Sequence, residues 1–212
     1  MDGCDRPAPV PTIGETDKGG PVGKTIVDIS PSLDGYVAGE GVGVDAPFGT
    51  AGQRLTAWSM EDPDDVDKAA ARVMFEDTGA FVIGRTLFDV GIGLWGEDGT
   101  WGMPVYVVTH RPGPDLVKGP TRFSFVAGVE KALRRAKETA AGRDVVIAGG
   151  ASVVRQALAG GWVDELRLHI VPEMVGGGTR LFEGADSASL TQVSAAAGRN
   201  AVHVTYRVEG RG

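Results

Sequence analysis

Apolar residues in the middle of the chain form short unbroken runs, each followed by apolar residues at helical spacing. The clearest case is 144–160, where residues 145–148 read Val-Val-Ile-Ala. A run dense in β-branched residues and bounded by glycines is typical of a strand buried on both faces. After Gly149 and Gly150, apolar side chains recur along one helical face. We expect a central strand joined to a helix by a glycine turn.

The same reading along the rest of the chain predicts alternating strands and helices. Two segments near the end, 190–195 and 201–208, alternate like an antiparallel pair. This order predicts an α/β fold with three αβα layers and a mixed, mostly parallel sheet whose C-terminal strands are antiparallel. The other predicted strands are 25–29, 36–38, 80–83, 104–109, 123–126 and 164–171, and the other helices are 63–78, a short one carrying Leu87 and Phe88, and 129–141.

Two segments do not follow this alternation. Residues 1–24 are rich in proline and glycine without apolar periodicity, so we expect a flexible arm there and a single domain over 25–212. Residues 39–60 are glycine-rich and long for a connection, which is typical of a lid or binding loop. Phe48, Leu55 and Trp58 are its expected anchors.

Composition excludes several classes of protein. The chain has 212 residues, 28 of them acidic and 21 basic, and its net charge of -7 disfavours nucleic acid as a partner. No run reaches the roughly 20 apolar residues needed to cross a bilayer, and no secretory signal is visible, so we expect a cytoplasmic protein without membrane contact. The single cysteine, Cys4, excludes a disulfide framework and a cysteine zinc site, and no metal is expected.

The glycine turn is the first candidate for chemistry. Free N–H groups and the positive end of the dipole at a helix N-terminus attract anions, and glycine lets a phosphate approach the backbone. The turn matches neither a GxGxxG fingerprint nor a P-loop, so on its own it is equally well a tight connection. Two other predicted strands end at basic residues, Arg85 in one case and His110 with Arg111 in the other. Ligands of such sheets bind beyond the carboxyl ends of the strands.

Several ordered motifs follow one another between Thr25 and Val208. They are SLDGYVAG (32–39), PFGTAGQRLTAW (47–58), VIGRTLFD (82–89), VYVVTHRP (105–112), IAGGASVVRQAL (147–158) and DELRLHIVPEMVGGGTRLF (164–182). Together they resemble the dihydrofolate reductase superfamily, in the branch that contains the reductase domain of the bacterial riboflavin-pathway deaminase-reductase. The resemblance implies a reductase that uses NADPH and often forms a homodimer.

Carried over by position, the resemblance implies a cofactor site. The Gly149-Gly150 bond would be a cis peptide, as in relatives. From the residues alone, Arg85 can equally cap a helix and Arg111 can be a solvated loop charge. The implied contacts are Gly149, Gly150, Ala151, Ser152, Val153 and Val154 with the pyrophosphate, Gly84, Arg85 and Thr86 with the pyrophosphate and ribose, Thr109, His110 and Arg111 with the adenosine 2′-phosphate, and Val37 and Ala38 beside the nicotinamide.

The catalytic group is less well defined. Dihydrofolate reductases carry a carboxylate on the helix after the first loop, and the remodelled loop 39–60 offers no clear counterpart. Asp34 is the preferred candidate, Glu173 is the next and Asp45 the third, although Asp34 also fits a turn-forming role. We expect an NADPH-dependent reductase of a small heterocyclic (pterin- or pyrimidine-like), imine or carbonyl substrate. The alternatives are a non-catalytic ligand-binding or resistance-type protein on the same fold, and a reductase that tailors a specialised metabolite.

Overall fold

The structure is a computed structural model and describes residues 23–185 and 187–210. The predicted arm at 1–24, with Cys4, lies almost wholly outside these residues. A small sheet pairs β2 (Tyr36–Ala38) with β9 (Thr179–Arg180). The strands of the main sheet are β1 (Thr25–Ile29), β3 (Thr78–Gly84), β4 (Val105–Val108), β5 (Leu116–Lys118), β6 (Thr121–Val126), β7 (Asp144–Ile147), β8 (Glu165–Ile170), β10 (Leu190–Ala197) and β11 (Val202–Val208).

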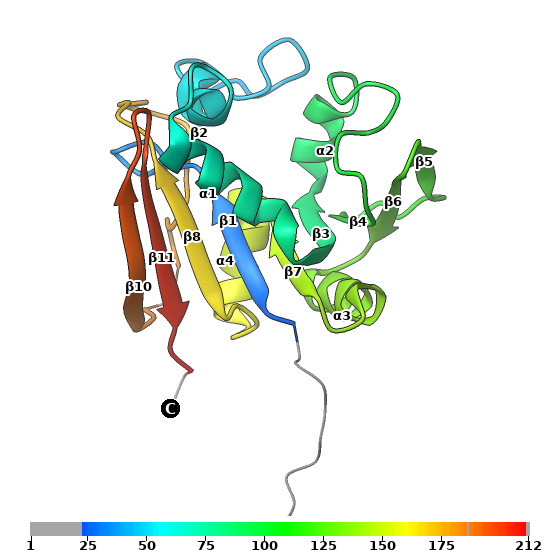
Figure 1. The fold of residues 1–212 in the computed structure, drawn as a ribbon. Coiled ribbons are helices and arrows are strands. Elements are labelled where there is room, and N and C mark those ends of the chain that lie inside the picture. The colour runs from blue at the N-terminus through cyan, green and yellow to red at the C-terminus, as the bar shows by residue number, and fades with distance from the viewer. Residues whose placement is uncertain (1–22, 186, 211–212) are drawn as a thin grey trace, which may run out of the picture.

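The main sheet has the strand order β10-β11-β8-β1-β7-β3-β4-β6-β5 (Figure 1). The strands from β8 to β6 in this order run parallel, whereas β5, β10 and β11 pair antiparallel with their neighbours. This confirms the predicted mixed sheet with antiparallel strands at the C-terminus. Strand β7 lies at its centre, as predicted, and Val145, Val146 and Ile147 are 0% exposed.

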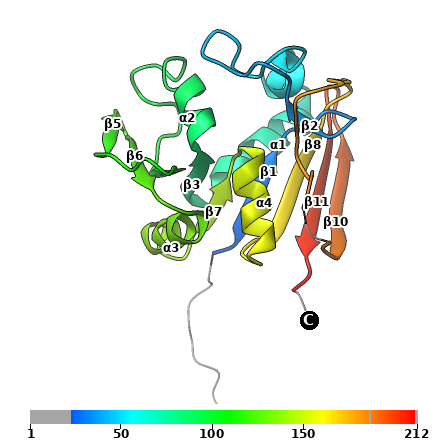
Figure 2. The ribbon, with the colours of Figure 1, turned by 180° about the vertical axis from the view of Figure 1, so that it is seen from behind.

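Helices cover both faces of the sheet (Figures 1 and 2). The helices α1 (Asp65–Glu76) and α2 (Arg85–Gly91) pack on one face, and α3 (Val129–Ala140) and α4 (Ala151–Ala159) on the other. Because strand side chains alternate, Ile26 and Val146 join the core under α1 and α2, while Val27 joins the core under α3 and α4. The three-layer αβα prediction is confirmed.

Short elements were missed by sequence reasoning. Strands β5 and β9 have three and two residues, too few for a periodic signal. The long loop contains a 3₁₀ helix, η1 (Gln53–Ser59), which buries Leu55 and Trp58 as expected, whereas Phe48 is only partly buried. Strand β2 does not rejoin the main sheet, because the chain turns after β1 and pairs with β9. None of the described helices is long and apolar enough to span a membrane.

Candidate functional site

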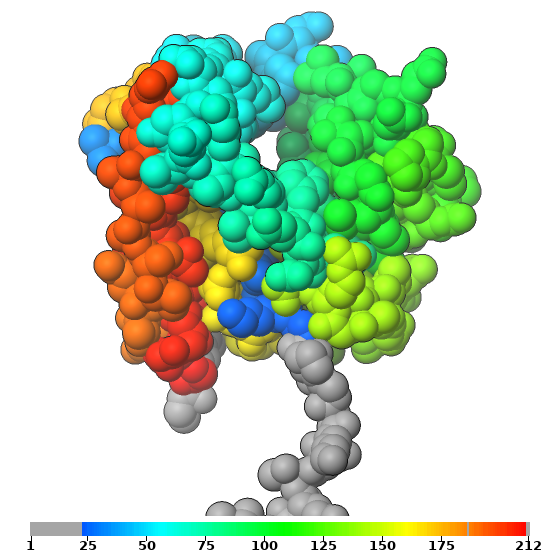
Figure 3. Space-filling model, in the orientation of Figure 1, coloured from blue at the N-terminus to red at the C-terminus, as the bar shows by residue number. Residues whose placement is uncertain are grey.

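Three of the predicted site segments follow neighbouring parallel strands. The glycine turn follows β7, the segment 84–86 follows β3, and the segment 109–111 follows β4. These strands are adjacent in the order β7-β3-β4, so the three segments share the carboxyl edge of the sheet. Above this edge, the space-filling view shows an opening between the atoms of α1 and those of the α2 region (Figure 3).

The glycine turn presents bare backbone at the start of α4. The Gly149-Gly150 peptide is cis, as the resemblance implied, and Gly150 is the N-cap of the helix. Its carbonyl oxygen accepts hydrogen bonds from the N–H groups of Val153 and Val154 at 2.9 and 3.2 Å. Within the described part of the chain, the N–H groups of Gly150, Ala151 and Ser152 have no acceptor. A Cβ built on Gly150 would meet nothing within 4 Å, so these donors border open space.

Gly84 holds the start of α2 against this turn. Its N–H donates to the Gly149 carbonyl oxygen at 2.8 Å. A Cβ on Gly84 would lie 3.2 Å from the Gly150 nitrogen and 3.3 Å from a methyl of Val153, closer than ordinary contacts. The position therefore favours glycine, because any Cβ there would require its neighbours to move by a few tenths of an ångström.

Arg85 and Thr86 begin α2, but only the Arg85 side chain is held by neighbouring side chains. The Arg85 Nε lies 2.6 Å from Asp89 Oδ1, and its guanidinium stands over the rings of Phe88 and Phe125 at 5.9 and 5.8 Å. Thr86 is exposed. Arg85 is thus already partnered within the protein, as the alternative reading of its charge allowed.

The segment after β4 holds one buried threonine followed by two exposed basic residues. Thr109 is buried, its N–H donates to Val126 O at 2.9 Å, and its hydroxyl accepts from the Arg111 N–H at 3.1 Å. His110 and Arg111 are exposed, and their side chains have no ion-pair partner among residues 23–185 and 187–210. They are available to an anion from solution.

The candidate carboxylates hold neighbouring loops together. Asp34 accepts hydrogen bonds from the Ser32 hydroxyl and from the N–H groups of Val175 and Gly176 at 3.1 and 2.8 Å. The bond from Ser32, aided by these two, lowers the pKa of Asp34 to about 2. At neutral pH Asp34 is therefore ionised and has no proton to donate.

The Glu173 and Asp45 carboxylates do not cluster with that of Asp34. The Glu173 Oε1 lies 2.6 Å from Arg54 Nε, which ties η1 to the loop after β8. Asp45 is exposed in the turn bridged between Gly43 and Ala46. Both side chains border the carboxyl edge as loop residues.

Val37 and Ala38 lie in β2 on the α4 side of the sheet (Figure 2). Val37 packs against the core that contains Val154 and Leu181. Arg180 of β9 covers the ring of Tyr36 at 4.4 Å. The β2–β9 sheet therefore borders the helix whose first turn carries the free N–H groups.

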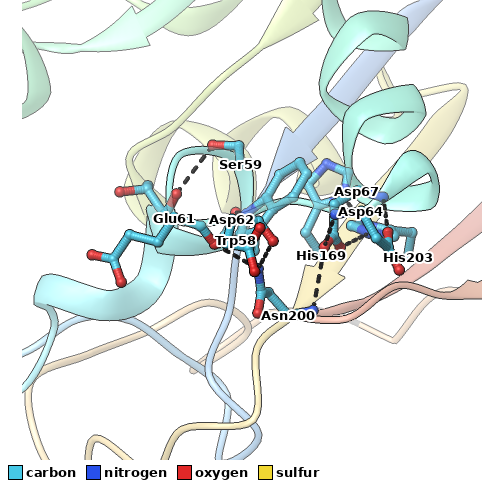
Figure 4. Close-up of polar contacts among 11 residues, drawn as sticks. Trp58, Ser59, Glu61, Asp62, Asp64, Asp67, His169, Asn200 and His203 are labelled. Atoms are coloured by element: carbon cyan, nitrogen blue, oxygen red, sulfur yellow. Dashed lines mark hydrogen bonds and ion pairs between the residues drawn. The ribbon is translucent and has the colours of Figure 1, made fainter.

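A buried polar row was missed by sequence reasoning (Figure 4). We call it the histidine row. It lies on the α1 side of the sheet, beneath Trp58, whose ring centroid is 4.4 Å from that of His169. In the sequence, its members appear as an aspartate inside an apolar strand segment and as histidines in strands that alternate polar and apolar residues. Only the strand order shows that these residues meet. In order along the row, its residues are Asp28 of β1, His169 of β8, His203 of β11 and Asp67 of α1.

Known proteins match the chain in fold and family. The family model of the RibD C-terminal domain matches residues 24–204. No curated protein sequence matches the chain. Among solved structures, a putative riboflavin biosynthesis protein from Shewanella sp. PV-4 aligns with a TM-score of 0.68 and 21% identity, over 88% of this chain and 99% of that one.

Two other solved structures show the same fold at lower identity. A dihydrofolate reductase from Enterococcus faecalis, complexed with NADP(H) and RAB-propyl, has a TM-score of 0.58 and 16% identity over 89% of this chain and 98% of that one. A deaminase/reductase from Thermotoga maritima has a TM-score of 0.59 and 14% identity, over 88% of this chain and 56% of that one. The chain therefore belongs to the RibD C-terminal domain family, a reductase family with a dihydrofolate-reductase-like α/β fold.

Proposed function

We propose that the protein binds NADPH across the carboxyl edge of its sheet and transfers hydride to a small heterocyclic, imine or carbonyl substrate. The observation that carries this proposal is the open backbone of the glycine turn, where a Cβ at Gly150 would meet nothing within 4 Å. A pyrophosphate fits there because the N–H groups of Gly150, Ala151 and Ser152 have no acceptor in the described chain and stand at the positive end of α4.

The flanking segments fit the two ends of the cofactor. Beyond β4, Arg111 would bind the adenosine 2′-phosphate with Thr109 and His110, since a guanidinium makes strong charge-assisted bonds to phosphate. Beyond β3, Arg85 and Thr86 would border the pyrophosphate and ribose. The order of these segments along the sheet edge supports the proposal, because a dinucleotide is long enough to cross neighbouring strand ends.

The remaining site residues would shape the nicotinamide end. Val37 and Ala38 would lie beside the ring, Val153 and Val154 would hold α4 in place through their burial, and Gly149 would meet the pyrophosphate with Gly150. Asp34 and Glu173 would keep the surrounding loops closed through their bonds to Gly176 and Arg54. When bound, reduced nicotinamide supplies the hydride, and the chain orients it and excludes water.

The test is to titrate the protein with NADPH by fluorescence and then follow NADPH absorbance with dihydrofolate, an aminopyrimidine and a cyclic imine. We expect saturable binding and oxidation with at least one acceptor. Binding without oxidation of any acceptor would favour a non-catalytic ligand-binding protein. Absence of NADPH binding would remove the proposal.

Arg111→Ala is expected to weaken the binding of NADPH much more than the binding of NADH. The lost charge-assisted bond to the 2′-phosphate is worth about 1.5–3 kcal/mol, which is roughly 10-fold to 150-fold in affinity. The measurement is titration of both cofactors with the variant and the wild type. Arg134→Ala, at an exposed position on α3, is the matched control and should change neither affinity. Equal losses for both cofactors would contradict the role of Arg111.

We further propose a homodimer that pairs through β10. This strand lies at the edge of the sheet, and all eight of its residues are exposed, including Leu190 and Val193 at 44% and 57%. Open edge strands bind other strands through unpaired backbone groups, and a second copy would cover them. Sedimentation equilibrium should give twice the chain mass, and Val193→Lys should lower it towards one chain. A monomeric wild type would contradict the dimer.

A further inference from the structure

The histidine row joins three strands and one helix through three hydrogen bonds. Asp28 Oδ1 lies 3.0 Å from His169 Nε2. The two histidine Nδ1 atoms lie 2.8 Å apart, and His203 Nε2 lies 3.0 Å from Asp67 Oδ1 (Figure 4). The residues are between 0% and 8% exposed. The row is therefore a continuous buried path for a proton.

The geometry restricts how many protons the row holds. Two Nδ1 atoms at hydrogen-bond distance need one proton between them, because two protons would repel and none would leave two lone pairs facing each other. Each Nε2 atom faces a carboxylate oxygen and is suited to donate to it. With both carboxylates ionised, the two rings thus carry three N–H protons, which makes one ring an imidazolium and the other neutral.

The surroundings of His203 disfavour the imidazolium charge on that ring. Burial lowers the pKa of His203 below its ordinary 6.5, the hydrogen bond to Asp67 opposes this, and a positive His169 lowers it further. Other charged groups packed around the row are few. They are Glu165 and Arg167 of β8, which pair with each other, Asp64 at the N-cap of α1, and Arg199 before β11. The pKa of Asp64 is lowered mainly by the hydrogen bond from the Asp67 N–H.

The Asp28 end of the row reaches the strand beside the glycine turn. Val27 pairs with Ile147, the last residue of β7, and the Ile29 side chain lies 3.6 Å from a Cβ built on Gly149. Asp28 lies between Val27 and Ile29 in β1. Its side chain faces the α1 side of the sheet, on which the opening in Figure 3 lies. Its Oδ2 is buried and has no hydrogen-bond partner within the described residues. A buried acceptor left unpaired costs about 1–3 kcal/mol, which points to a partner outside the chain.

The opposite side of the row is open to water. A hollow of about 270 Å³ between α1 and strands β8, β10 and β11 is lined by both histidines, together with Ser194 and Thr205. Protons from solvent can reach the imidazoles through this hollow. A proton can therefore enter the row at the histidines and reach Asp28 at its other end.

We propose that Asp28 is the catalytic proton donor of the reductase and that His169 and His203 are positioning residues that store and resupply its proton. The proposal rests on the proposed function. The protonated ring pair first passes the Nε2 proton of His169 to Asp28 Oδ1, which leaves both rings neutral. The carbon of the substrate C=N or C=O bond accepts the hydride pair, and its nitrogen or oxygen takes this proton from Asp28. Asp28 is then a carboxylate again, and a proton from water in the hollow restores the third N–H proton of the rings.

The first test is Asp28→Asn, which keeps an acceptor for His169 but removes the exchangeable proton. We expect unchanged NADPH affinity and a loss of kcat of about 100-fold or more, in the range of general acid catalysis. Glu165→Gln is the matched control, since it neutralises another largely buried carboxylate, one paired with Lys24 and Arg167. Equal kcat in Asp28→Asn and wild type would overturn the proposal. Failure of the wild type to bind NADPH would instead overturn the proposed function.

The second test reads the shared proton without any substrate. The chain has three histidines, so ¹⁵N-histidine spectra of the full chain can be assigned with His110→Gln. We expect a single proton coupled to the Nδ1 atoms of both His169 and His203, and a joint titration. His203→Gln should remove that signal and move the pH profile of kcat. Independent titration of the rings, or a pH profile unmoved in His203→Gln, would overturn the storage role.

Discussion

Gly150→Val is expected to abolish NADPH binding while the protein remains folded. The new side chain finds free room, because a Cβ on Gly150 meets nothing within 4 Å, and the φ of -80° at this residue is open to any L residue. That room is where the pyrophosphate would lie. Losing two charge-assisted bonds of about 1.5 kcal/mol each weakens binding by roughly 100-fold or more. NADPH titration and thermal unfolding of the variant measure both effects.

Gly93→Val is the matched control for this substitution. A Cβ on Gly93 also meets nothing within 4 Å, and the residue is exposed. The control should bind NADPH like the wild type. Wild-type affinity in Gly150→Val itself would show that the turn is only a connection between β7 and α4.

Asp67→Ala should lower the free energy of unfolding by about 3–5 kcal/mol, the usual effect of removing one partner from a buried hydrogen-bonded network that contains a charge. Asp67 is 0% exposed, its Oδ1 lies 3.0 Å from His203 Nε2, and its Oδ2 accepts from the N–H groups of Asp64 and Asn200, both at 3.3 Å. The substitution leaves these donors unpaired and removes the capping box of α1. Urea unfolding gives the difference directly.

Asp65→Ala tests whether the effect comes from burial rather than from lost charge at the start of α1. Asp65 lies in the same helical turn, but its side chain is fully exposed and its only described ion pair, with Lys68, spans 4.0 Å. Its loss should change stability by less than about 1 kcal/mol. Similar losses in both variants would contradict the structural role of Asp67.

The fold was predictable where one segment carries its own signal. The apolar run before Gly149 and the helical stripe after it identify β7 and α4, because both patterns are local. Strands β5 and β9 escaped prediction since two or three residues show no period. The pairing of β2 with β9 depends on a contact between residues more than 140 positions apart, which spacing does not reveal.

The candidate site shows the same division. The segments of the proposed cofactor site could be predicted to lie together because each directly follows a strand, and parallel strands end at one edge. Asp34 was chosen as a catalytic group from its loop position, but its partners Val175 and Gly176 are 141 and 142 positions away. Asp28 and His169 are also 141 positions apart, so their contact is visible only once β1 and β8 are known to pair.

The close fit of Gly84 against Gly150 has a practical consequence for protein engineering. A side chain at Gly84 would require the Gly150 backbone and the Val153 methyl to move by a few tenths of an ångström, so engineering of coenzyme preference has little room there. His110 and Arg111, by contrast, project into solvent from a rim that the core does not constrain. On the proposed cofactor site, libraries aimed at that rim would change the coenzyme preference without altering the core beneath.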